Sequence, residues 1–330
     1  MHPDPPLLAL RADRGRLALR GSDRRAYLHG LLSNDVLTLT PGEWRYATLL
    51  TPQGRMLTDM RVFELGDYTL VDLPVETTQA IREHLDKFII TEDVTVEDMT
   101  ADLAQVGLYG PGAGTLIETI RAGDAPAPLH VLPSDDLGVM GVDLIVARDR
   151  ADALVEALTT AGATPVALDA LEVTRVEAGI PRFPVDMDTT TIPLEAGIED
   201  RAISLTKGCY VGQEVIIRVL HRGGGRVARR LVKLEAGDQP IAAGDTIRAG
   251  DREIGRVTSA VHSERAGAWI ALAYVQRDFA DPGTAVEVVT IVGQTRATVQ
   301  ALKAPRSTPE HPEAPRSTSK HPRSTLKHPD

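Results

Sequence analysis

The stretch from Lys207 to Leu234, KGCYVGQEVIIRVLHRGGGRVARRLVKL, separates two kinds of sequence. Its first residues hold a cysteine and a tyrosine between two glycines, and three valines follow at spacings of four. That spacing predicts a helix starting near Cys209, although the apolar run VIIRVL also fits a strand. The glycines then interrupt the pattern, and only strand-like segments follow Val227. We therefore place a domain boundary near residue 228.

The residues after this boundary alternate apolar runs with turns. Turn signals occur at AGD (Ala249 to Asp251) and VGQ (Val292 to Gln294). About 75 residues of this kind predict a small antiparallel β-barrel or sandwich over residues 229–303. The expected strands are Arg230–Leu234, Thr246–Arg248, Arg252–His262, Trp269–Val275, Val286–Ile291 and Gln294–Leu302, the last two paired.

Residues 1–228 mix strands and helices without a strict alternation of the two. This pattern predicts an α+β region with antiparallel strands. The expected helices are Asp23–Leu32, Pro74–Phe88, Gly114–Arg121, Arg150–Ala161 and Leu168–Glu177. The expected strands are Leu17–Leu19, Arg45–Leu50, Gly54–Leu65, Tyr68–Asp72, Val94–Glu97, Leu103–Tyr109, Leu129–Leu132 and Gly138–Val146.

The composition excludes several classes of protein. The 330 residues include 36 basic and 46 acidic ones, and the formal net charge of -10 disfavours direct nucleic-acid binding. The single cysteine rules out an intramolecular disulfide and a cysteine-based metal site within one chain. HExxH, GxSxG and paired-cysteine patterns are missing, so we expect no resident metal. The apolar runs are short, which predicts a cytoplasmic protein that does not contact a membrane.

Residues 304–330 differ from the rest of the chain. They repeat PRST three times, with EHP or KHP between the copies, and carry almost no apolar residues. Such low complexity predicts a disordered, solvated tail. Its basic residues outnumber its acidic ones, which makes the rest of the chain more acidic than the total suggests.

Cys209 and Lys207 are the first candidates for chemistry. A thiol at the start of a helix and beside a lysine is favoured as its thiolate by the helix dipole and by the positive charge. This interpretation makes Cys209 a reactive group with Lys207 as its partner. The alternative is a small buried apolar residue, as free cysteines usually are. A strand in place of the helix would also remove the dipole.

Positive charge gathers directly after the cysteine. Residues 215–234 contain no acidic residue and six basic ones: Arg218, Arg222, Arg226, Arg229, Arg230 and Lys233. On a glycine-rich backbone in an acidic chain, this basic island suits an anionic ligand such as a phosphate or a carboxylate. The alternative is a solvated face that distant acids balance.

Two glutamates lie in apolar surroundings bounded by prolines and glycines. Glu177 belongs to VEAGIPRF and Glu195 to IPLEAGI. A carboxylate in such a place needs a donor, because burying it unpaired is costly. A heteroaromatic ligand with adjacent N–H groups would satisfy it, and so would an internal arginine such as Arg175 or Arg182.

Taken in order, five segments resemble the YgfZ-type folate-binding proteins, a branch of the glycine-cleavage T-protein, or aminomethyltransferase, superfamily. The resemblance covers Leu17 to Leu302, and KGCYVGQE is the segment that marks this branch. The five are LLSNDV (Leu31 to Val36), TPQGRM (Thr51 to Met56), RVEAGIPRF (Arg175 to Phe183), PLEAGI (Pro193 to Ile198) and KGCYVGQE (Lys207 to Glu214).

The resemblance implies a fold, a cofactor and a cellular role. The fold would be a T-protein-like folate-binding region around a central cavity, followed by a C-terminal β-barrel. The cofactor would be tetrahydrofolate or a derivative. The role would be assembly or repair of iron–sulfur enzymes, some of them tRNA-modifying, with those enzymes or assembly factors as partners and the motif cysteine required.

The same resemblance assigns residues to the folate. Glu195 would hold the pterin, and Glu177 and Tyr210 join it as cofactor-binding candidates. Arg226 and Arg229 of the basic island would attract the glutamate tail of the folate.

One departure from the superfamily opens an alternative. Aminomethyltransferases of the superfamily usually carry two consecutive acids after the first hairpin, where this chain has Thr58 and Asp59. An aspartate at this place assists methylene transfer in those enzymes. Asp59 is therefore a catalytic candidate, and the alternative function is a tetrahydrofolate-dependent aminomethyltransferase or a related one-carbon transferase. A third interpretation, an RNA-binding module built on the basic island, is opposed by the net acidity.

Overall fold

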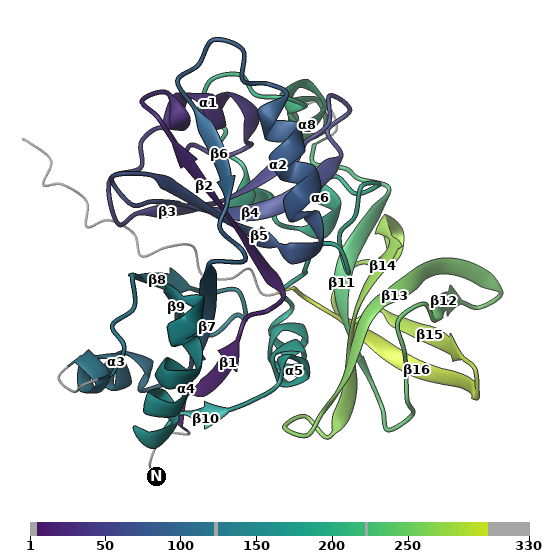
Figure 1. The fold of residues 1–330 in the computed structure, drawn as a ribbon. Helices are drawn as coiled ribbons and strands as arrows, with labels where there is room; N and C mark the ends of the chain where they lie inside the picture. The colour runs from purple at the N-terminus through teal and green to yellow at the C-terminus, as the bar shows by residue number, and fades with distance from the viewer. Residues whose placement is uncertain (1–4, 122–124, 222–223, 303–330) are drawn as a thin grey trace, which may run out of the picture.

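The computed structural model describes residues 5–121, 125–221 and 224–302. Figure 1 shows two lobes built on separate sheets and, beside them, a barrel, with helix α5 (Leu168–Ala178) lying between the lower lobe and the barrel. The predicted tail, residues 304–330, lies outside the described residues.

The first lobe contains a five-stranded antiparallel sheet in the order β3-β4-β5-β2-β6. Helices α1 (Arg24–Leu31) and α2 (Thr78–Asp86) bury one apolar stripe each, which contributes Leu28 and Leu85 to the core of this lobe. Each fully buried leucine contributes about 2 kcal/mol of hydrophobic free energy. The strands are β2 (Arg14–Arg20), β3 (Trp44–Leu50), β4 (Met56–Glu64), β5 (Thr69–Pro74) and β6 (Thr95–Asp98).

The second lobe contains another five-stranded sheet, in the order β10-β1-β7-β9-β8. Helices α3 (Ala113–Arg121) and α4 (Ala151–Thr160) pack on it through a shared apolar cluster. Strand β10 pairs with β1 in parallel, and the other pairs are antiparallel. The strands are β1 (Leu7–Leu10), β7 (Leu103–Tyr109), β8 (His130–Ser134), β9 (Gly141–Ala147) and β10 (Thr164–Pro165).

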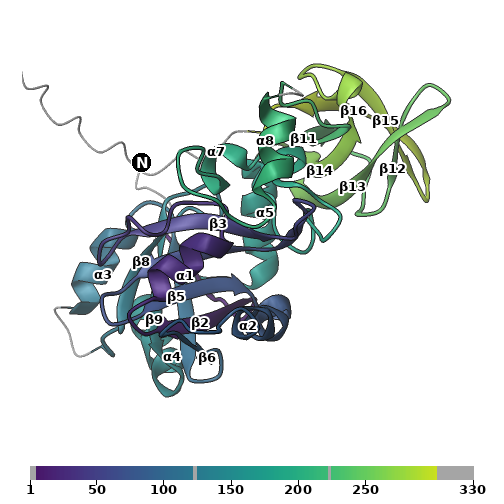
Figure 2. The ribbon, with the colours of Figure 1, turned by 90° about the horizontal axis from the view of Figure 1, so that it is seen from above.

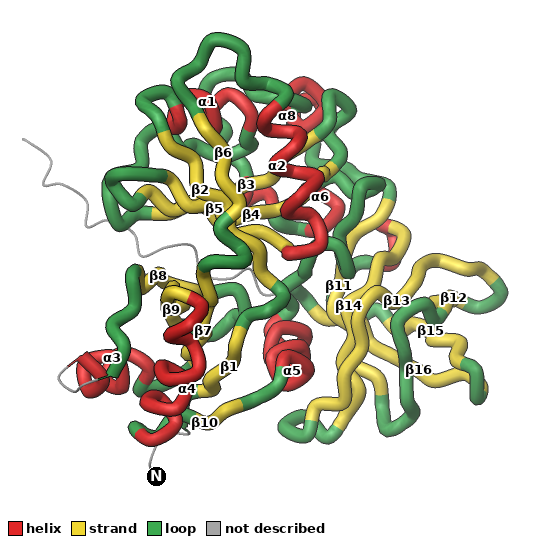
Figure 3. Tube along the Cα trace, viewed as in Figure 1, coloured by secondary structure: helices red, strands yellow, loops and turns green. Residues whose placement is uncertain are grey.

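Residues after Arg229 form a closed six-stranded antiparallel barrel, which Figure 3 shows as an almost helix-free body. The barrel closes because β11 pairs with β14 on one side and with β16 on the other. Alternate residues of each strand point inward, and valines and alanines fill the interior. The strands are β11 (Arg229–Ala236), β12 (Thr246–Ala249), β13 (Arg252–Ser263), β14 (Ala268–Gln276), β15 (Ala285–Thr290) and β16 (Gly293–Gln300).

Helix α5 and the segment after it connect the lobes to the barrel. Helix α5 packs against β13 and β14 and ends at Gly179, whose φ of 80° is the left-handed conformation that favours glycine. Three further helices follow: α6 (Pro193–Ala196), α7 (Glu199–Ala202) and α8 (Gln213–His221). Figure 2 shows α5, α7 and α8 lying between the first lobe and the barrel. This placement brings residues of both lobes and of the connecting segment together.

The expected fold class, α+β with a C-terminal antiparallel barrel, is confirmed. The sequence did not predict β1, which lies after a proline-rich start and pairs with strands about 100 and 155 residues away. The region 1–228 was expected as one body and contains two sheets. No helix among the described residues is long and apolar enough to cross a membrane.

Candidate functional site

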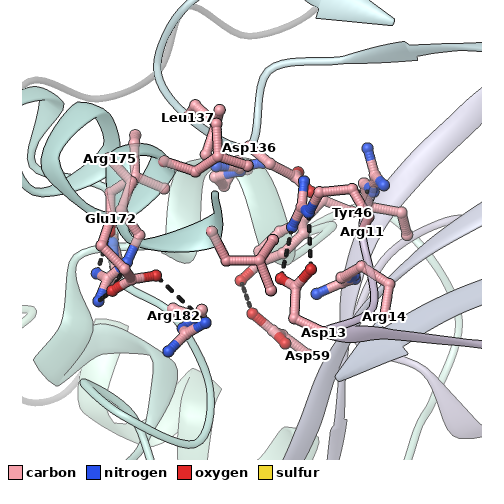
Figure 4. A pocket seen from close by; sticks show the side chains of 16 residues that line it. Arg11, Asp13, Arg14, Tyr46, Asp59, Asp136, Leu137, Glu172, Arg175 and Arg182 are labelled. Atoms are coloured by element: carbon pink, nitrogen blue, oxygen red, sulfur yellow. Dashed lines mark hydrogen bonds and ion pairs between the residues drawn. The ribbon is translucent and has the colours of Figure 1, made fainter. Parts of the chain in front are cut away.

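A cavity of about 50 Å³ lies where the two lobes meet α5 (Figure 4). Six arginines and four carboxylates line it, so its wall is strongly polar. The charged lining residues are Arg11, Asp13, Arg14, Asp59, Arg61, Asp136, Glu172, Arg175, Arg182 and Arg201, and Tyr46 is beside them. We call this space the inner cavity.

Asp59 lies on β4 with its side chain toward the inner cavity, and only 7% of the residue is exposed. The Tyr46 hydroxyl donates a hydrogen bond of 2.8 Å to Asp59 Oδ2. The other oxygen, Oδ1, is buried and has no hydrogen-bond partner among the residues that the structure describes. Burial raises the pKa of Asp59, and the nearby Asp136 adds to the rise. A carboxylate with one free, buried oxygen is suited to accept an N–H or to hold a proton.

Alternation along β4 decides which residues face the cavity. Asp59 and Arg61 share the cavity face, whereas Thr58 points to the other side, where its hydroxyl lies 3.2 Å from that of Thr77. The acid that this chain retains is thus the one that lines the cavity.

Tyr46 and Arg201 form one wall beside Asp59. The guanidinium carbon of Arg201 lies 4.1 Å from the centroid of the Tyr46 ring, a cation–π contact. Arg201 also donates to Asp135 at 3.2 Å. Burial raises the pKa of Tyr46, and the neighbouring Asp59 carboxylate raises it further, so the hydroxyl remains a donor.

Three other carboxylates lie together near the inner cavity, with oxygens of Asp72, Asp136 and Asp143 within 4.8 Å of one another. Arg61 forms ion pairs with all three. Arg14 adds a hydrogen bond of 2.7 Å to Asp72. Although burial alone would raise the pKa of Asp72, the two arginines hold it well below its usual range. The cluster is therefore already compensated by protein cations.

A second, larger cavity of about 740 Å³ lies between the α6–α7 segment and the barrel. We call it the outer cavity. Pro181 and Arg201 line both cavities, so the two spaces adjoin at these residues. Glu195 and Arg230 line the outer cavity, which falls within the usual size range of small-molecule sites.

Glu195 lies on α6 with Arg229 of the barrel as its partner. Two guanidinium nitrogens of Arg229 donate to Glu195 Oε2 at 3.2 and 3.3 Å. The same guanidinium lies 4.5 Å from the centre of the Tyr274 ring. Oxygen Oε2 of Glu195 is thus held by the barrel and also accepts the backbone N–H of Ile192 at 3.5 Å, and Oε1 has no hydrogen-bond partner among the described residues.

The cysteine segment differs from its prediction. Helix α8 begins at Gln213, four residues after Cys209, because Gly212 takes a φ of 84° and turns the chain first. Cys209 is exposed and lies outside the first turn of the helix, so the helix dipole does not act on its thiol. The expected helix near Cys209 therefore forms, and the alternative strand does not, but the cysteine precedes the helix and is not part of its first turn.

The side chain of Lys207 binds backbone oxygens and not the thiol. Its ammonium group donates to the backbone oxygens of His29 and Leu32 at 2.5 Å each and of Asn34 at 3.2 Å. Burial lowers the pKa of Lys207 to about 8. These bonds satisfy carbonyls at the end of α1, so Lys207 anchors the cysteine segment and is not the thiol's partner.

The comparisons with known proteins agree with this architecture. A model described as the GCVT N-terminal domain matches residues 12–148, and one described as the glycine cleavage T-protein C-terminal barrel domain matches residues 229–305. The aminomethyltransferase of Synechococcus elongatus is 31% identical over 305 residues, which cover 86% of this chain and 81% of that protein.

The chain belongs to the glycine-cleavage T-protein, or aminomethyltransferase, family. The aminomethyltransferase of Rubrobacter xylanophilus is 30% identical over 79% of this chain and 73% of its own length. The crystal structure of aminomethyltransferase T from Bartonella henselae has the same fold, with a TM-score of 0.80 at 22% identity, over 91% of this chain and 86% of that one.

In this member of the T-protein family, the remaining candidate site residues do not lie together. Tyr210 is buried in an apolar cluster that includes Phe183 and Leu194, and its hydroxyl has no hydrogen-bond partner in the described part of the chain. Its ring lies 5.0 Å from the Lys207 ammonium group, and burial raises its pKa to about 12. Tyr210 lines neither cavity among the described linings.

The basic island does not form one site. Arg218 and Arg226 are exposed, Arg229 binds Glu195, and Arg230 lines the outer cavity. Lys233 donates to the backbone oxygen of Glu177. Arg222 lies outside the described residues. The interpretation of the basic island as a site for an anionic ligand therefore applies to single arginines and not to the run as a whole.

Glu177 does not face a ligand cavity. It accepts hydrogen bonds from Ser263 and Arg265 of the barrel, so it joins α5 to the barrel. The partners that the sequence suggested for it, Arg175 and Arg182, bind Glu172 instead. The prediction of a folate contact at Glu177 conflicts with this position, because both of its oxygens already have protein donors.

The sequence missed Tyr46, Arg14 and Arg201 as site residues. One signal was present in β4, a buried strand that is otherwise mostly apolar. Asp59 and Arg61 are two positions apart in it, so two charged side chains share one face of the strand. The charged run RADRGR (residues 11–16), which leads into the start of β2, was a second signal, because it supplies Arg11, Asp13 and Arg14 to the cavity.

Proposed function

We propose that the chain is a tetrahydrofolate-dependent one-carbon transferase of the aminomethyltransferase kind, in which Asp59 contacts the reacting part of the folate. Members of the family use tetrahydrofolate as substrate or cofactor. The observation that carries the proposal is the buried Asp59 oxygen without a partner in an arginine-rich cavity. A buried carboxylate oxygen in that state favours a ligand that brings an N–H donor.

The donor set fits the chemical groups of a folate. The free oxygen of Glu195 offers an acceptor for the N–H edge of a pterin, and Arg229 fixes its orientation. Arg230 on the outer cavity and the exposed Arg226 offer cations for the glutamate carboxylates. The outer cavity has the volume for such a ligand, and Arg201 links it to the Asp59 cavity.

The chemistry of the site depends on the raised pKa of Asp59. Tetrahydrofolate, when bound, supplies two neighbouring nitrogens that together accept a one-carbon unit. Asp59 holds a proton at Oδ1 at higher pH than an ordinary aspartate does, and returns to the carboxylate when it gives that proton up. Tyr46 keeps Oδ2 in place throughout, since its own raised pKa preserves its hydrogen.

The test is ammonia release from an aminomethyl-carrying lipoyl protein in the presence of tetrahydrofolate. The wild type should release ammonia only when the folate is added, and Asp59→Asn should lose at least about 100-fold in rate. Glu177→Gln is the matched control, because this carboxylate lies outside both cavities, and it should keep most of the rate. No release by the wild type would remove the proposal.

A second function is carried by a different observation. Cys209 is exposed in the branch-marking segment KGCYVGQE, which Lys207 fastens to the end of α1. This placement suits contact with a partner protein, and it supports assistance to iron–sulfur enzymes, including tRNA-modifying ones, as in the YgfZ-type branch. One thiolate cannot hold a cluster alone, so the partner would supply the other ligands.

Replacing Cys209 distinguishes the two proposed functions. Cys209→Ala should leave folate binding and ammonia release unchanged, because the thiol lines neither cavity. It should abolish support of iron–sulfur enzyme activity in cells that lack the native protein. If iron–sulfur enzyme activity in these cells is the same with Cys209→Ala as with the wild type, the proposed role of the thiol is wrong, and the transferase proposal is unaffected.

A further inference from the structure

Asn34 lies in the LLSNDV segment, after the end of α1. Both hydrogens and the oxygen of its side-chain amide form hydrogen bonds. Its nitrogen Nδ2 donates to the backbone oxygen of Tyr46 at 2.9 Å and to that of Arg201 at 2.8 Å. Its oxygen Oδ1 accepts the backbone N–H of the next residue, Asp35, at 2.8 Å. One side chain thus ties together two segments that are far apart in sequence.

Both accepted carbonyls lack a partner in their own element. Strand β3, which carries Tyr46, is an edge strand of its sheet. Helix α7, which carries Arg201, has four residues, so its last carbonyls have no helical donor. An amide that offers two hydrogens from one nitrogen satisfies both carbonyls at once. Alanine or an ionised aspartate at residue 34 offers no hydrogen to them, and serine offers a single hydroxyl hydrogen that cannot serve both.

The side chains of the same two residues meet beside Asp59. Arg201 covers the Tyr46 ring, and the Tyr46 hydroxyl reaches Asp59 Oδ2 at 2.8 Å. The backbone separation of the two residues therefore sets how both groups face the carboxylate.

We propose that Asn34 is a positioning residue for the Asp59 site, which holds Tyr46 and Arg201 in place by binding both backbones. The inference rests on the proposed function, because it assigns Asn34 a part in that reaction through Asp59. Asn34 lines neither cavity and so acts on the reaction only through these two residues.

The charges that face Asp59 determine the direction of the expected effect. Tyr46 from β3 and Arg201 from α7 favour its carboxylate form, and so does Arg14 from β2. Asp136, from the loop after β8, and burial favour the protonated form. Loosening Tyr46 and Arg201 weakens two of the groups that favour the carboxylate, so the pKa of Asp59 should rise further.

The experiment is a pH titration of the full chain labelled with ¹³C at aspartate carboxylates. The Asp59 resonance is assigned by its loss in Asp59→Asn. Asn34→Ala should move the Asp59 midpoint to higher pH, by at least as much as Tyr46→Phe does. In a Tyr46→Phe, Arg201→Leu background, Asn34→Ala should move the midpoint no further, because the residues through which it acts are gone.

Ser33→Ala is the matched control. The Ser33 hydroxyl donates to the backbone oxygen of Ala202 at 2.7 Å and lies 2.8 Å from that of Thr48, so this variant loses buried hydrogen bonds between the same segments. It keeps both bonds of Asn34 and should leave the Asp59 midpoint near that of the wild type. If Asn34→Ala fails to fold, Asn34→Ser, which has one hydroxyl hydrogen in place of the two amide hydrogens, replaces it.

An unchanged Asp59 midpoint in a folded Asn34 variant would overturn the proposal, and so would equal shifts in the Asn34 and Ser33 variants. The titration needs no folate and no turnover. Its outcome is therefore separate from that of the ammonia assay, in which failure of the wild type would count against the transferase function alone.

Discussion

Tyr46 donates its hydroxyl hydrogen to one oxygen of Asp59 at 2.8 Å, while the other oxygen of Asp59 is buried without a partner. This half-satisfied carboxylate sets the chemistry of the inner cavity. A fully paired carboxylate would be a structural ion pair, as Asp72 is, and a fully exposed one would titrate as an ordinary aspartate. The predictions below follow from this state and from its contrast with neighbouring groups.

Tyr46→Phe should raise the pKa of Asp59. The hydroxyl stabilises the carboxylate form, so removing it favours the protonated form. Any limb of the pH–rate profile that Asp59 controls should move to higher pH in this variant. The measurement is the transferase rate between pH 5 and 9, and a profile that coincides with that of the wild type would contradict the assignment.

Asp59→Asn should stabilise the folded protein at neutral pH by about 1 kcal/mol. The pKa of Asp59 is higher in the folded state than in the unfolded state, so its contribution to stability is largest at low pH and is lost as the pH rises from the unfolded-state pKa through the folded-state pKa. At neutral pH the buried negative charge therefore destabilises the fold, and asparagine removes that charge. Urea unfolding at pH 7 measures the change, and a clear loss of stability would show that the carboxylate is satisfied.

Asp72→Asn should destabilise the folded protein, in contrast to Asp59→Asn. The free energy of unfolding should fall by about 3 kcal/mol or more, because Arg14 and Arg61 are left buried without a full counter-charge. The folded-state pKa of Asp72 is lowered, so its contribution is present above the unfolded value and is lost as the pH falls below it. The same unfolding series, repeated toward pH 3, checks both the size and the direction.

Thr58→Asp restores the pair of consecutive acids that aminomethyltransferases usually carry, and it should not raise the transferase rate. Thr58 is fully buried and faces Thr77, away from the cavity. A charge there has no partner, so the variant should lose about 3 kcal/mol or more of stability. Thr58→Val is the control with unchanged shape. A faster Thr58→Asp enzyme would refute the assignment of strand faces.

Lys207→Met should weaken the attachment of the cysteine segment and lower the free energy of unfolding by about 2 kcal/mol, because one buried and two partly buried carbonyls lose their donor. Cys209→Ala should change stability by less than about 0.5 kcal/mol, since the thiol is exposed. Urea unfolding of the two variants side by side distinguishes an anchoring lysine from one that serves the thiol. Equal stabilities of both with the wild type would contradict the anchoring role.

The pattern of apolar residues predicted most elements within a few positions, because the helices and strands of this chain are amphipathic and bounded by glycine and proline. It predicted the barrel for the same reason. It failed for β1, whose pairing partners are remote in sequence, and for Cys209, where Gly212 turns the chain before α8 begins.

Two of the residues singled out in the sequence, Asp59 and Glu195, line cavities, and their roles toward a folate stay predictions. The partners of Glu195 and Glu177 come from the barrel, and no local pattern indicates them. Tyr46, Arg201 and Asn34 owe their positions to contacts between segments more than 150 residues apart. Such contacts follow from the assembled fold and not from spacing along the chain.

Titration of the full chain with reduced tetrahydrofolate by calorimetry tests the central claim most directly. The account predicts saturable binding at one site by the wild type, and affinity at least about tenfold weaker in Glu195→Ala, where the pterin acceptor held by Arg229 is lost. Glu177→Gln should bind as the wild type does. No saturable binding by the wild type, or equal binding by Glu195→Ala, would contradict it.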